Sequence, residues 1–204
     1  AADIQFHTAT GGIAKFASCI RELANTDADI IVDDVIYPHQ PMFQDGEVAN
    51  AVNDVNEEGV AYFSSAGNRG LDGYRNSSKI VSNPESNYKG FHDFDPSNAE
   101  DTSLDVSLPA NSKIDLAFQW SDPVTGGPIP NDYDIFITDE QGNTLDAGMT
   151  NNQTLPFERV EYFNHSSNDV DLQIVIGHWS GPEATELKVV NFRSGGILQN
   201  NASY

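Results

Sequence analysis

Hydrophobic positions follow a helical spacing in the first third of the chain. Apolar residues recur three and four positions apart over 13–24 and again over 48–55, which predicts two helices that each bury one face. Short apolar runs at 3–9, 29–32 and 60–63 predict three strands. The order strand, helix, strand, helix, strand predicts a partial parallel α/β sheet of three strands and two helices, joined by right-handed crossovers.

Beyond residue 100 the spacing changes to alternation of apolar and polar residues. The alternating segments are 104–108, 114–120, 133–137, 160–162, 172–176 and 187–192. Turn residues fall between several of them, at Gly126-Gly127, Gly142-Asn143 and Gly181-Pro182. Short strands at this spacing predict an all-β antiparallel sandwich, jelly-roll-like in its connections.

The change of pattern predicts two domains. We expect an α/β domain over 1–75, a polar and turn-rich linker over 76–91, a β-sandwich over 92–193 and a return toward the first domain over 194–204. The first apolar run begins at residue 3, and three strands are few for such a sheet, so we expect a piece of a longer chain. A sheet this small leaves edges and an apolar face bare, which predicts a dimer or cover by the β-domain.

Composition narrows the classes of function. Hydrophobic residues make up 38% of the chain and aromatic residues 10%, which is typical of a folded globular protein. With 31 acidic and 10 basic residues the net charge is −21, so we expect neither nucleic acid nor a membrane surface as a partner. Cys19 is the single cysteine, which excludes an internal disulfide, and its place in the first helical pattern predicts a buried thiol.

Two positions at predicted strand ends carry candidate chemistry. Asn68 follows the strand 60–63, where open α/β sheets place reacting groups, and its carboxamide could donate a hydrogen bond to a developing oxyanion. Gly67-Asn68 could instead be turn residues only. Asp33-Asp34 follows the strand 29–32 and could share a proton for acid–base work, or one acid could cap the loop while the other faces solvent.

The second half of the chain holds a candidate cation site. Asp122, Asp132 and Asp134 surround a predicted hairpin, and Asp132 and Asp134 lie on one face of a strand, as oxygen ligands of calcium would. The spacing is not that of a dedicated calcium loop, and solvation of the hairpin is the alternative. No other metal or cofactor is expected.

A complete nucleophilic triad within the 204 residues is disfavoured. The sequence has no Gly-x-Ser-x-Gly elbow, and none of its histidines stands in a base motif. These histidines are His7, His39, His92, His165 and His178.

Three segments of the first domain resemble the subtilisin-like serine peptidases. They are Asp29-Ile-Ile-Val-Asp-Asp34, Phe43-Gln-Asp-Gly46 and Val60-Ala-Tyr-Phe-Ser-Ser-Ala-Gly-Asn68. In that family a strand ending Ala-Gly-Asn supplies the oxyanion-hole asparagine, so the resemblance implies that role for Asn68. It also implies a substrate-binding segment at Asp34, Val35 and Ile36. The chain departs there from the family's small and glycine residues, so no pocket preference follows.

The second domain is similar to a β-sandwich inserted in some bacterial members of the family. His92-Asp-Phe-Asp95, Phe118-Gln-Trp120 and Asn131-Asp-Tyr-Asp-Ile-Phe-Ile137 carry this similarity. In the family the insert lies between the oxyanion asparagine and a Gly-Thr-Ser motif, with the catalytic Asp and His upstream. The resemblance therefore implies a secreted bacterial endopeptidase that cleaves polypeptides, with its triad outside these residues, and an inactive isolated chain.

Two other functions remain open at this point. The sandwich could be a non-catalytic module that binds polypeptide or carbohydrate, with Trp179 as an exposed anchor, or Trp179 could cover the edge of the core. Alternatively, the sandwich could be a structural insert that limits access to a peptidase cleft.

Overall fold

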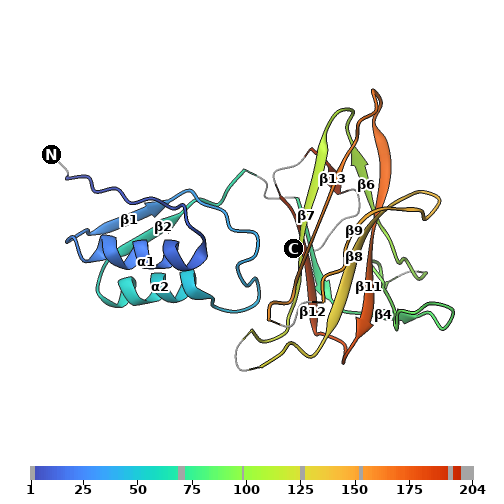
Figure 1. The fold of residues 1–204 in the computed structure, drawn as a ribbon, viewed down its shortest axis with the longest axis horizontal. Helices are drawn as coiled ribbons and strands as arrows, with labels where there is room; N and C mark the ends of the chain where they lie inside the picture. The colour runs from blue at the N-terminus through green and yellow to red at the C-terminus, as the bar shows by residue number, and fades with distance from the viewer. Residues whose placement is uncertain are drawn as a thin grey trace. The chain divides into compact units, whose positions relative to one another are not determined.

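The computed structural model describes residues 3–68, 72–97, 99–124, 127–151, 154–192 and 195–198. The chain divides into two compact units, residues 1–70 and 71–204. The elements of the first unit are α1 (Ile13–Ala24), β1 (Ile30–Asp33), α2 (Glu47–Glu57) and β2 (Ala61–Ser64) (Figure 1). Each unit is described by itself.

The first unit is a parallel strand pair packed against two helices. β1 and β2 pair in parallel from Ile30 opposite Ala61 to Asp33 opposite Ser64. The two helices lie side by side next to the strands (Figure 1). Their predicted apolar faces form the core, together with Ile31 of β1. The buried side chains are Phe16, Ala17, Ile20, Ile31, Val48, Ala51 and Val55. The predicted α/β pattern is therefore confirmed for both helices and two strands.

The expected first strand over 3–9 does not form, and the described sheet of this unit has two strands. Ile4 and Phe6 are 85% and 90% exposed, so the alternation that suggested a strand buries nothing. The segment is held by side chains instead: the Tyr37 hydroxyl donates to the carbonyl oxygen of Ala9, and His7 contacts Glu22 of α1. Hydrogen bonds to side chains thus replace the expected pairing with β1.

The two strands expose one apolar face. Ile30, Val32 and Phe63 are 59%, 72% and 58% exposed, whereas Ile31 between them is buried beneath the helices. This alternation follows from the two-residue period of a strand, because only one face meets the helices. A dimer, or another cover for this face, stays a prediction.

The second unit is an antiparallel β-sandwich, which confirms the predicted class. One sheet has the order β10-β7-β12-β3. The other centres on β11, which pairs with β8 on one side and with β6 and β5 in succession on the other. The strands of the unit are β3 (Gly73–Ser77), β4 (Ile80–Ser82), β5 (Gly90–His92), β6 (Leu104–Leu108), β7 (Lys113–Trp120), β8 (Asp132–Asp139), β9 (Thr144–Gly148), β10 (Phe157–Phe163), β11 (Val170–Ser180), β12 (Glu186–Asn191) and β13 (Ile197–Leu198).

Alternate residues of the two sheets meet in one core. Phe118 and Trp120 of β7 and Tyr133 of β8 are 0% exposed. Their rings pack against one another, with Trp120 centred 5.5 Å from Phe118 and 5.4 Å from Tyr133. The segments that alternate in the sequence are thus the strands that face this core.

The expected linker and the expected return segment differ from what the structure describes. Residues 76–91 contribute to β3, β4 and β5, which pair with β12 and β11. At the end of the described chain, β13 pairs with β6. Both segments therefore belong to the sandwich as far as they are described, while residues 194 and 199–204 of the expected return lie outside the described residues. The sequence did not predict these strands because they are short, and β3, β4 and β13 lie at sheet edges.

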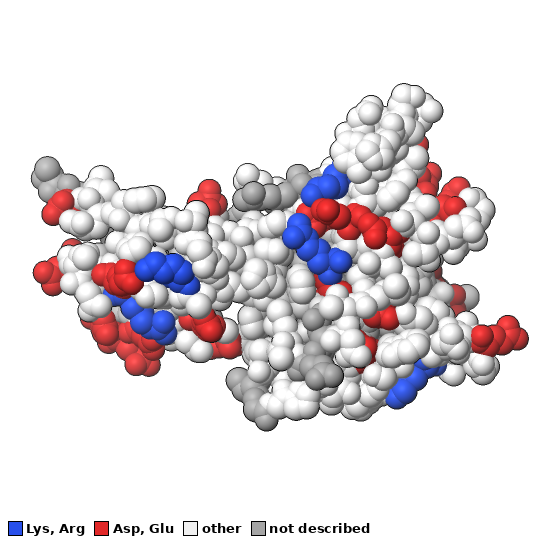
Figure 2. Space-filling model, viewed as in Figure 1, with Lys and Arg blue, Asp and Glu red and all other residues white. Residues whose placement is uncertain are grey.

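Acidic side chains predominate on the face shown in Figure 2, with basic ones scattered among them. Most basic side chains of the described residues contact an acid. These ion pairs are Lys15–Glu22, Arg21–Asp54, Arg75–Glu186, Lys79–Asp93, Lys113–Asp115 and Arg159–Asp115. In the described part of the chain, neither helix is long and apolar enough to cross a membrane.

Candidate functional site

The carboxyl ends of β1 and β2 place several predicted site residues at one edge of the sheet. The strands are parallel and in register, with Asp33 opposite Ser64. The next residues also meet, because the Ser65 hydroxyl donates to Asp34 Oδ1 over 2.6 Å. The strand register thus brings the acidic pair to the loop that leads to Asn68.

The two acids of the pair are bonded separately. Asp33 accepts hydrogen bonds from the Tyr62 hydroxyl at 2.5 Å, from the Val35 N–H at 3.1 Å and from the Ser64 hydroxyl at 3.1 Å. Burial and the contact with Asp33 raise the pKa of Tyr62 above its ordinary value. Asp34 is exposed and accepts from Ser65. This arrangement favours the interpretation in which Asp33 caps the loop and Asp34 faces solvent, rather than the shared proton.

Asn68 lies four residues past the last residue of β2 and is exposed. Gly67 before it has a φ of 71°, a left-handed conformation that costs glycine little. The chain therefore turns sharply after Ala66, at the edge where Asp34 and Ser65 meet. An exposed carboxamide at a strand end can donate a hydrogen bond to a bound group.

The segment Asp34, Val35 and Ile36 leaves β1 without joining a helix or strand. Asp34 and Ile36 are exposed, Ile36 by 49%, and neither has a backbone hydrogen bond to another described residue. A backbone without such partners can pair with an extended peptide, which then adds as a strand. Asp34 and Val35 also border a pocket of about 240 Å³ that reaches His7 and Cys19.

The three aspartates of the predicted cation site do not share one environment. Asp122 is 6% exposed and accepts from Trp120 Nε1 at 2.9 Å and from Asn131 Nδ2 at 2.7 Å. Asp132 and Asp134 lie two apart on β8, and Asp134 accepts from the Tyr88 hydroxyl. Burial raises the pKa of all three carboxyls, and for Asp132 the neighbouring Asp134 adds to the rise. Each carboxylate oxygen of Asp122 thus already accepts a hydrogen bond. Calcium binding by Asp132 and Asp134 stays a prediction.

Glu158 is a buried carboxyl near this pair that the sequence did not single out. It is 1% exposed and accepts from the Thr150 N–H at 2.7 Å. Burial, with Asp134 and Asp132 adding to the effect, raises its pKa from 4.5 to about 7. Nothing in the sequence distinguishes Glu158, because polar residues such as Glu158 and Arg159 are ordinary in a strand of this kind.

The raised pKa of Glu158 predicts that stability falls as pH rises. Between pH 4.5 and about 7 the folded state keeps a proton that the unfolded state has released. The free energy of unfolding of the sandwich should therefore decline over this range, by up to about 1.4 kcal/mol per pH unit from this group. Urea unfolding at several pH values measures this pH dependence of the free energy of unfolding. Glu158→Gln should remove the contribution of Glu158, whereas Glu140→Gln, at an exposed position, should leave the pH dependence unchanged. An unchanged pH dependence in Glu158→Gln contradicts the raised pKa of Glu158.

Trp179 borders a second pocket, of about 280 Å³, on the sandwich. Its side chain is 44% exposed, and its ring centre lies 5.1 Å from that of Tyr88. Asn131 and Asp132 also line the pocket, and each has a buried oxygen, Oδ1, without a hydrogen-bond partner among the described residues. Trp179 is therefore an exposed aromatic beside two unpaired acceptors.

Two of the five histidines, His92 and His178, are buried in the sandwich. His92 is 0% exposed and bonds the Tyr74 hydroxyl at 2.7 Å through Nε2. His178 is 4% exposed and stacks on Tyr133 with ring centres 4.5 Å apart. Burial lowers the pKa of both, that of His92 to about 4. These two side chains are neutral members of the core.

Comparisons with known proteins found no match in sequence and a low similarity in structure. No protein-family model matches the sequence, and no curated protein matches it. Among solved structures, the Clostridium perfringens CspB protease is similar with a TM-score of 0.46 and 8% identity, over 87% of this chain and 38% of that one. The chain thus spans well under half the length of that structure.

Proposed function

We propose that the chain is part of a subtilisin-like serine endopeptidase and carries the oxyanion donor, Asn68. The observation that supports this best is the shared edge of β1 and β2. At this edge the Ser65 hydroxyl donates a hydrogen bond of 2.6 Å to Asp34 Oδ1, and the segment Ala66-Gly67-Asn68 follows directly. The order of these segments in the sequence is the one that the family uses for substrate pairing and for the oxyanion hole.

The proposed chemistry needs groups from outside these 204 residues. A serine, activated by a histidine, attacks the peptide carbonyl, and the carbonyl oxygen becomes an oxyanion in the tetrahedral intermediate. The Asn68 carboxamide and a backbone N–H donate hydrogen bonds to that oxygen. The substrate polypeptide lies along Asp34, Val35 and Ile36 and pairs with the backbone of Asp34 and Ile36. Secretion by a bacterium belongs to the same proposal.

The coding sequence on either side of this segment tests the proposal. An Asp-x-Gly and a His-Gly motif upstream, with a Gly-Thr-Ser motif downstream, are expected. Substituted triad positions would contradict a working peptidase and favour a binding role.

A second candidate function is carbohydrate binding by the sandwich. The pocket at Trp179 supports it, because a sugar ring can stack on the exposed indole of this pocket, which polar side chains such as Asn131 and Asp132 also line. An exposed aromatic ring beside polar side chains suits the apolar face and the hydroxyls of a sugar ring, which favours carbohydrate as the ligand of this pocket.

Trp179→Ala is expected to weaken sugar binding by at least about tenfold, which corresponds to about 1.4 kcal/mol of lost contact. Titration with soluble oligosaccharides of glucose and N-acetylglucosamine measures the affinity. Phe163→Ala is the matched control, since Phe163 is an exposed aromatic (41%) on β10 that does not line this pocket. Binding that is equal in the two variants, or no binding by the unaltered chain, contradicts this candidate.

A further inference from the structure

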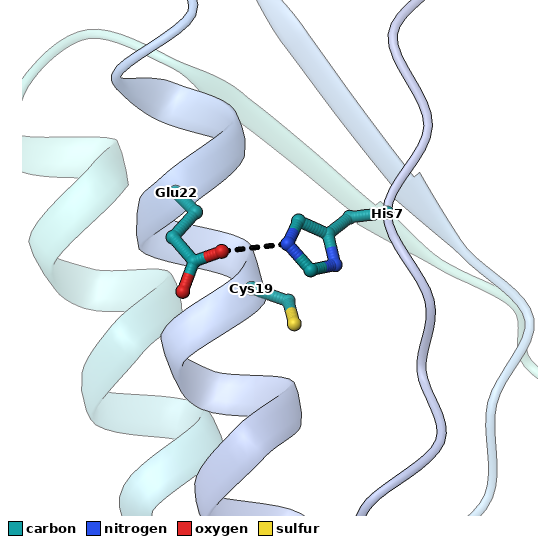
Figure 3. Close-up of side chains that lie close together, drawn as sticks. All are labelled: His7, Cys19 and Glu22. Atoms are coloured by element: carbon teal, nitrogen blue, oxygen red, sulfur yellow. Dashed lines mark hydrogen bonds and ion pairs between the residues drawn. The ribbon is translucent and has the colours of Figure 1, made fainter.

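Three side chains of metal-ligand type converge in the first unit. One ligand atom each of His7, Cys19 and Glu22 lies within 4.8 Å of the other two. Figure 3 shows the imidazole of His7 facing α1, where Cys19 and Glu22 project toward it. Among the described residues, this is the one group of three or more His, Cys, Asp or Glu side chains that meets this spacing.

The local structure explains the convergence. Cys19 and Glu22 are three residues apart on α1, so they lie on the same face of the helix. His7 comes from the extended segment before α1, which the bond from the Tyr37 hydroxyl to the Ala9 carbonyl holds in place. His7 Nε2 lies 2.6 Å from Glu22 Oε2.

Each of the three groups is available as a ligand. The carboxylate of Glu22 accepts hydrogen bonds from Ser18 and Lys15 through Oε1, and its Oε2 faces His7. His7 Nδ1 is buried and has no partner among the described residues. Cys19 is 2% exposed, is a free thiol, and lines the pocket of about 240 Å³ together with His7.

We propose that His7, Cys19 and Glu22 bind one zinc ion, with the fourth coordination position open to the pocket. A sulfur, an imidazole nitrogen and a carboxylate oxygen form a donor set that suits zinc, whereas calcium and magnesium take oxygen ligands. Tetrahedral bonds of about 2.0–2.3 Å place ligand atoms about 3.3–3.8 Å apart. The widest separations, of up to 4.8 Å, therefore need to close by roughly 1 Å, and the 2.6 Å contact between His7 Nε2 and Glu22 Oε2 needs to open by roughly 0.7 Å if both atoms bind the ion.

The charges and protons balance at such a site. Zinc binds the thiolate, so the Cys19 thiol releases one proton to solvent as the Zn–S bond forms. The thiolate and the Glu22 carboxylate then neutralise the two charges of the ion. Lys15 Nζ and the Ser18 hydroxyl bond Glu22 Oε1, at 3.2 and 2.9 Å, which leaves Oε2 facing His7. These contacts hold the carboxylate in place as ligand-orienting partners do.

The fourth position faces a pocket with apolar walls. Phe6, Phe16 and Leu23 line it beside His7 and Cys19. Three protein ligands and one open position are typical of zinc sites that hold a water molecule or an exchangeable ligand. Asn68 does not line this pocket, and zinc binding by the three side chains does not depend on the proposed oxyanion role.

Titration of the metal-free full chain with Zn²⁺ tests the proposal. One ion per chain is expected, and excess Ca²⁺ should not displace it. Because the chain has one cysteine, a thiolate-to-metal charge-transfer band in the Co²⁺-substituted protein reports on Cys19 alone. Zinc should also protect Cys19 from a thiol-reactive dye in the unaltered chain, a measurement that needs no variant.

Variants separate this site from adventitious binding by the acidic surface. Cys19→Ser, His7→Ala and Glu22→Gln should each weaken zinc binding by at least about tenfold, since loss of outer-shell partners alone costs 10- to 100-fold. His39→Ala and Glu57→Gln, at exposed positions, are the matched controls and should bind as the unaltered chain does. Circular dichroism confirms that each variant is folded. Absence of stoichiometric binding, absence of the thiolate band, or equal affinity in Cys19→Ser overturns the proposal.

Discussion

Replacing Asn68 by alanine in the proposed peptidase is expected to lower kcat by about 100- to 1,000-fold and to leave KM nearly unchanged. This range is the effect of removing one oxyanion-hole donor in a subtilisin. The carboxamide donates to an oxygen that is fully charged only in the tetrahedral intermediate. Its loss therefore raises the barrier without weakening the binding of the substrate.

The position of Asn68 makes this experiment clean. Asn68 is exposed after a glycine turn, outside the core of α1, α2 and the two strands, so its removal should cost little stability. Asn56→Ala, at an exposed position of α2, is the matched control and should keep full turnover. Steady-state kinetics with a chromogenic peptide separates kcat from KM. Equal turnover in Asn68→Ala would rule out the oxyanion role, and a rise in KM alone would indicate substrate binding instead.

Trp120→Ala is expected to destabilise the sandwich by about 3–5 kcal/mol. Trp120 is 0% exposed and packs against Phe118 and Tyr133, so truncation leaves a large cavity between the sheets. It also removes the donor 2.9 Å from Asp122 Oδ2. That oxygen would then be buried without its hydrogen bond, which adds to the cost.

Urea unfolding of the full chain, followed by circular dichroism and by tryptophan fluorescence, measures this loss. Trp120→Phe keeps most of the ring and loses the N–H, so it should cost distinctly less than the alanine variant. Trp179→Ala is the control for removing an indole from a surface position and should cost under about 1 kcal/mol. Similar losses in Trp120→Ala and Trp179→Ala would contradict the account of the core.

The regular parts of the fold could be predicted because they bury one face. The pattern of Phe16, Ala17 and Ile20 predicts α1, and these side chains are buried in it. In the same way the alternation of Leu172, Ile174 and Ile176 predicts β11, the central strand of its sheet. Burial of a repeating face selects the residue type at each position, and so it leaves a record in the sequence.

The edge strands and the first segment could not be predicted for the opposite reason. β3 includes Arg75 and Asn76 and pairs only with β12, so few of its positions are selected for burial. Ile4 and Phe6 alternate as strand residues do and are nevertheless exposed. Whether such a segment pairs depends on neighbours that are distant in the sequence.

The candidate sites also have some features that the sequence could predict and others that it could not. Asn68 and the acidic pair Asp33-Asp34 could be assigned to one sheet edge because each follows an apolar run, and parallel strands bring their carboxyl ends together. The separate bonding of Asp33 to Tyr62 and of Asp34 to Ser65 depends on strand register, which the pattern leaves undetermined.

By itself, the sequence determined the α/β and sandwich classes, the two helices, the core strands and the position of Asn68 at a strand end. The tertiary structure alone decided that His7 reaches Cys19 and Glu22, and that Asn131 and Asp132 keep unpaired oxygens beside Trp179. Periodic burial acts on neighbours a few residues apart and is therefore visible along the chain. Convergence of single side chains from separate segments depends on how the whole unit packs, and no local spacing records it.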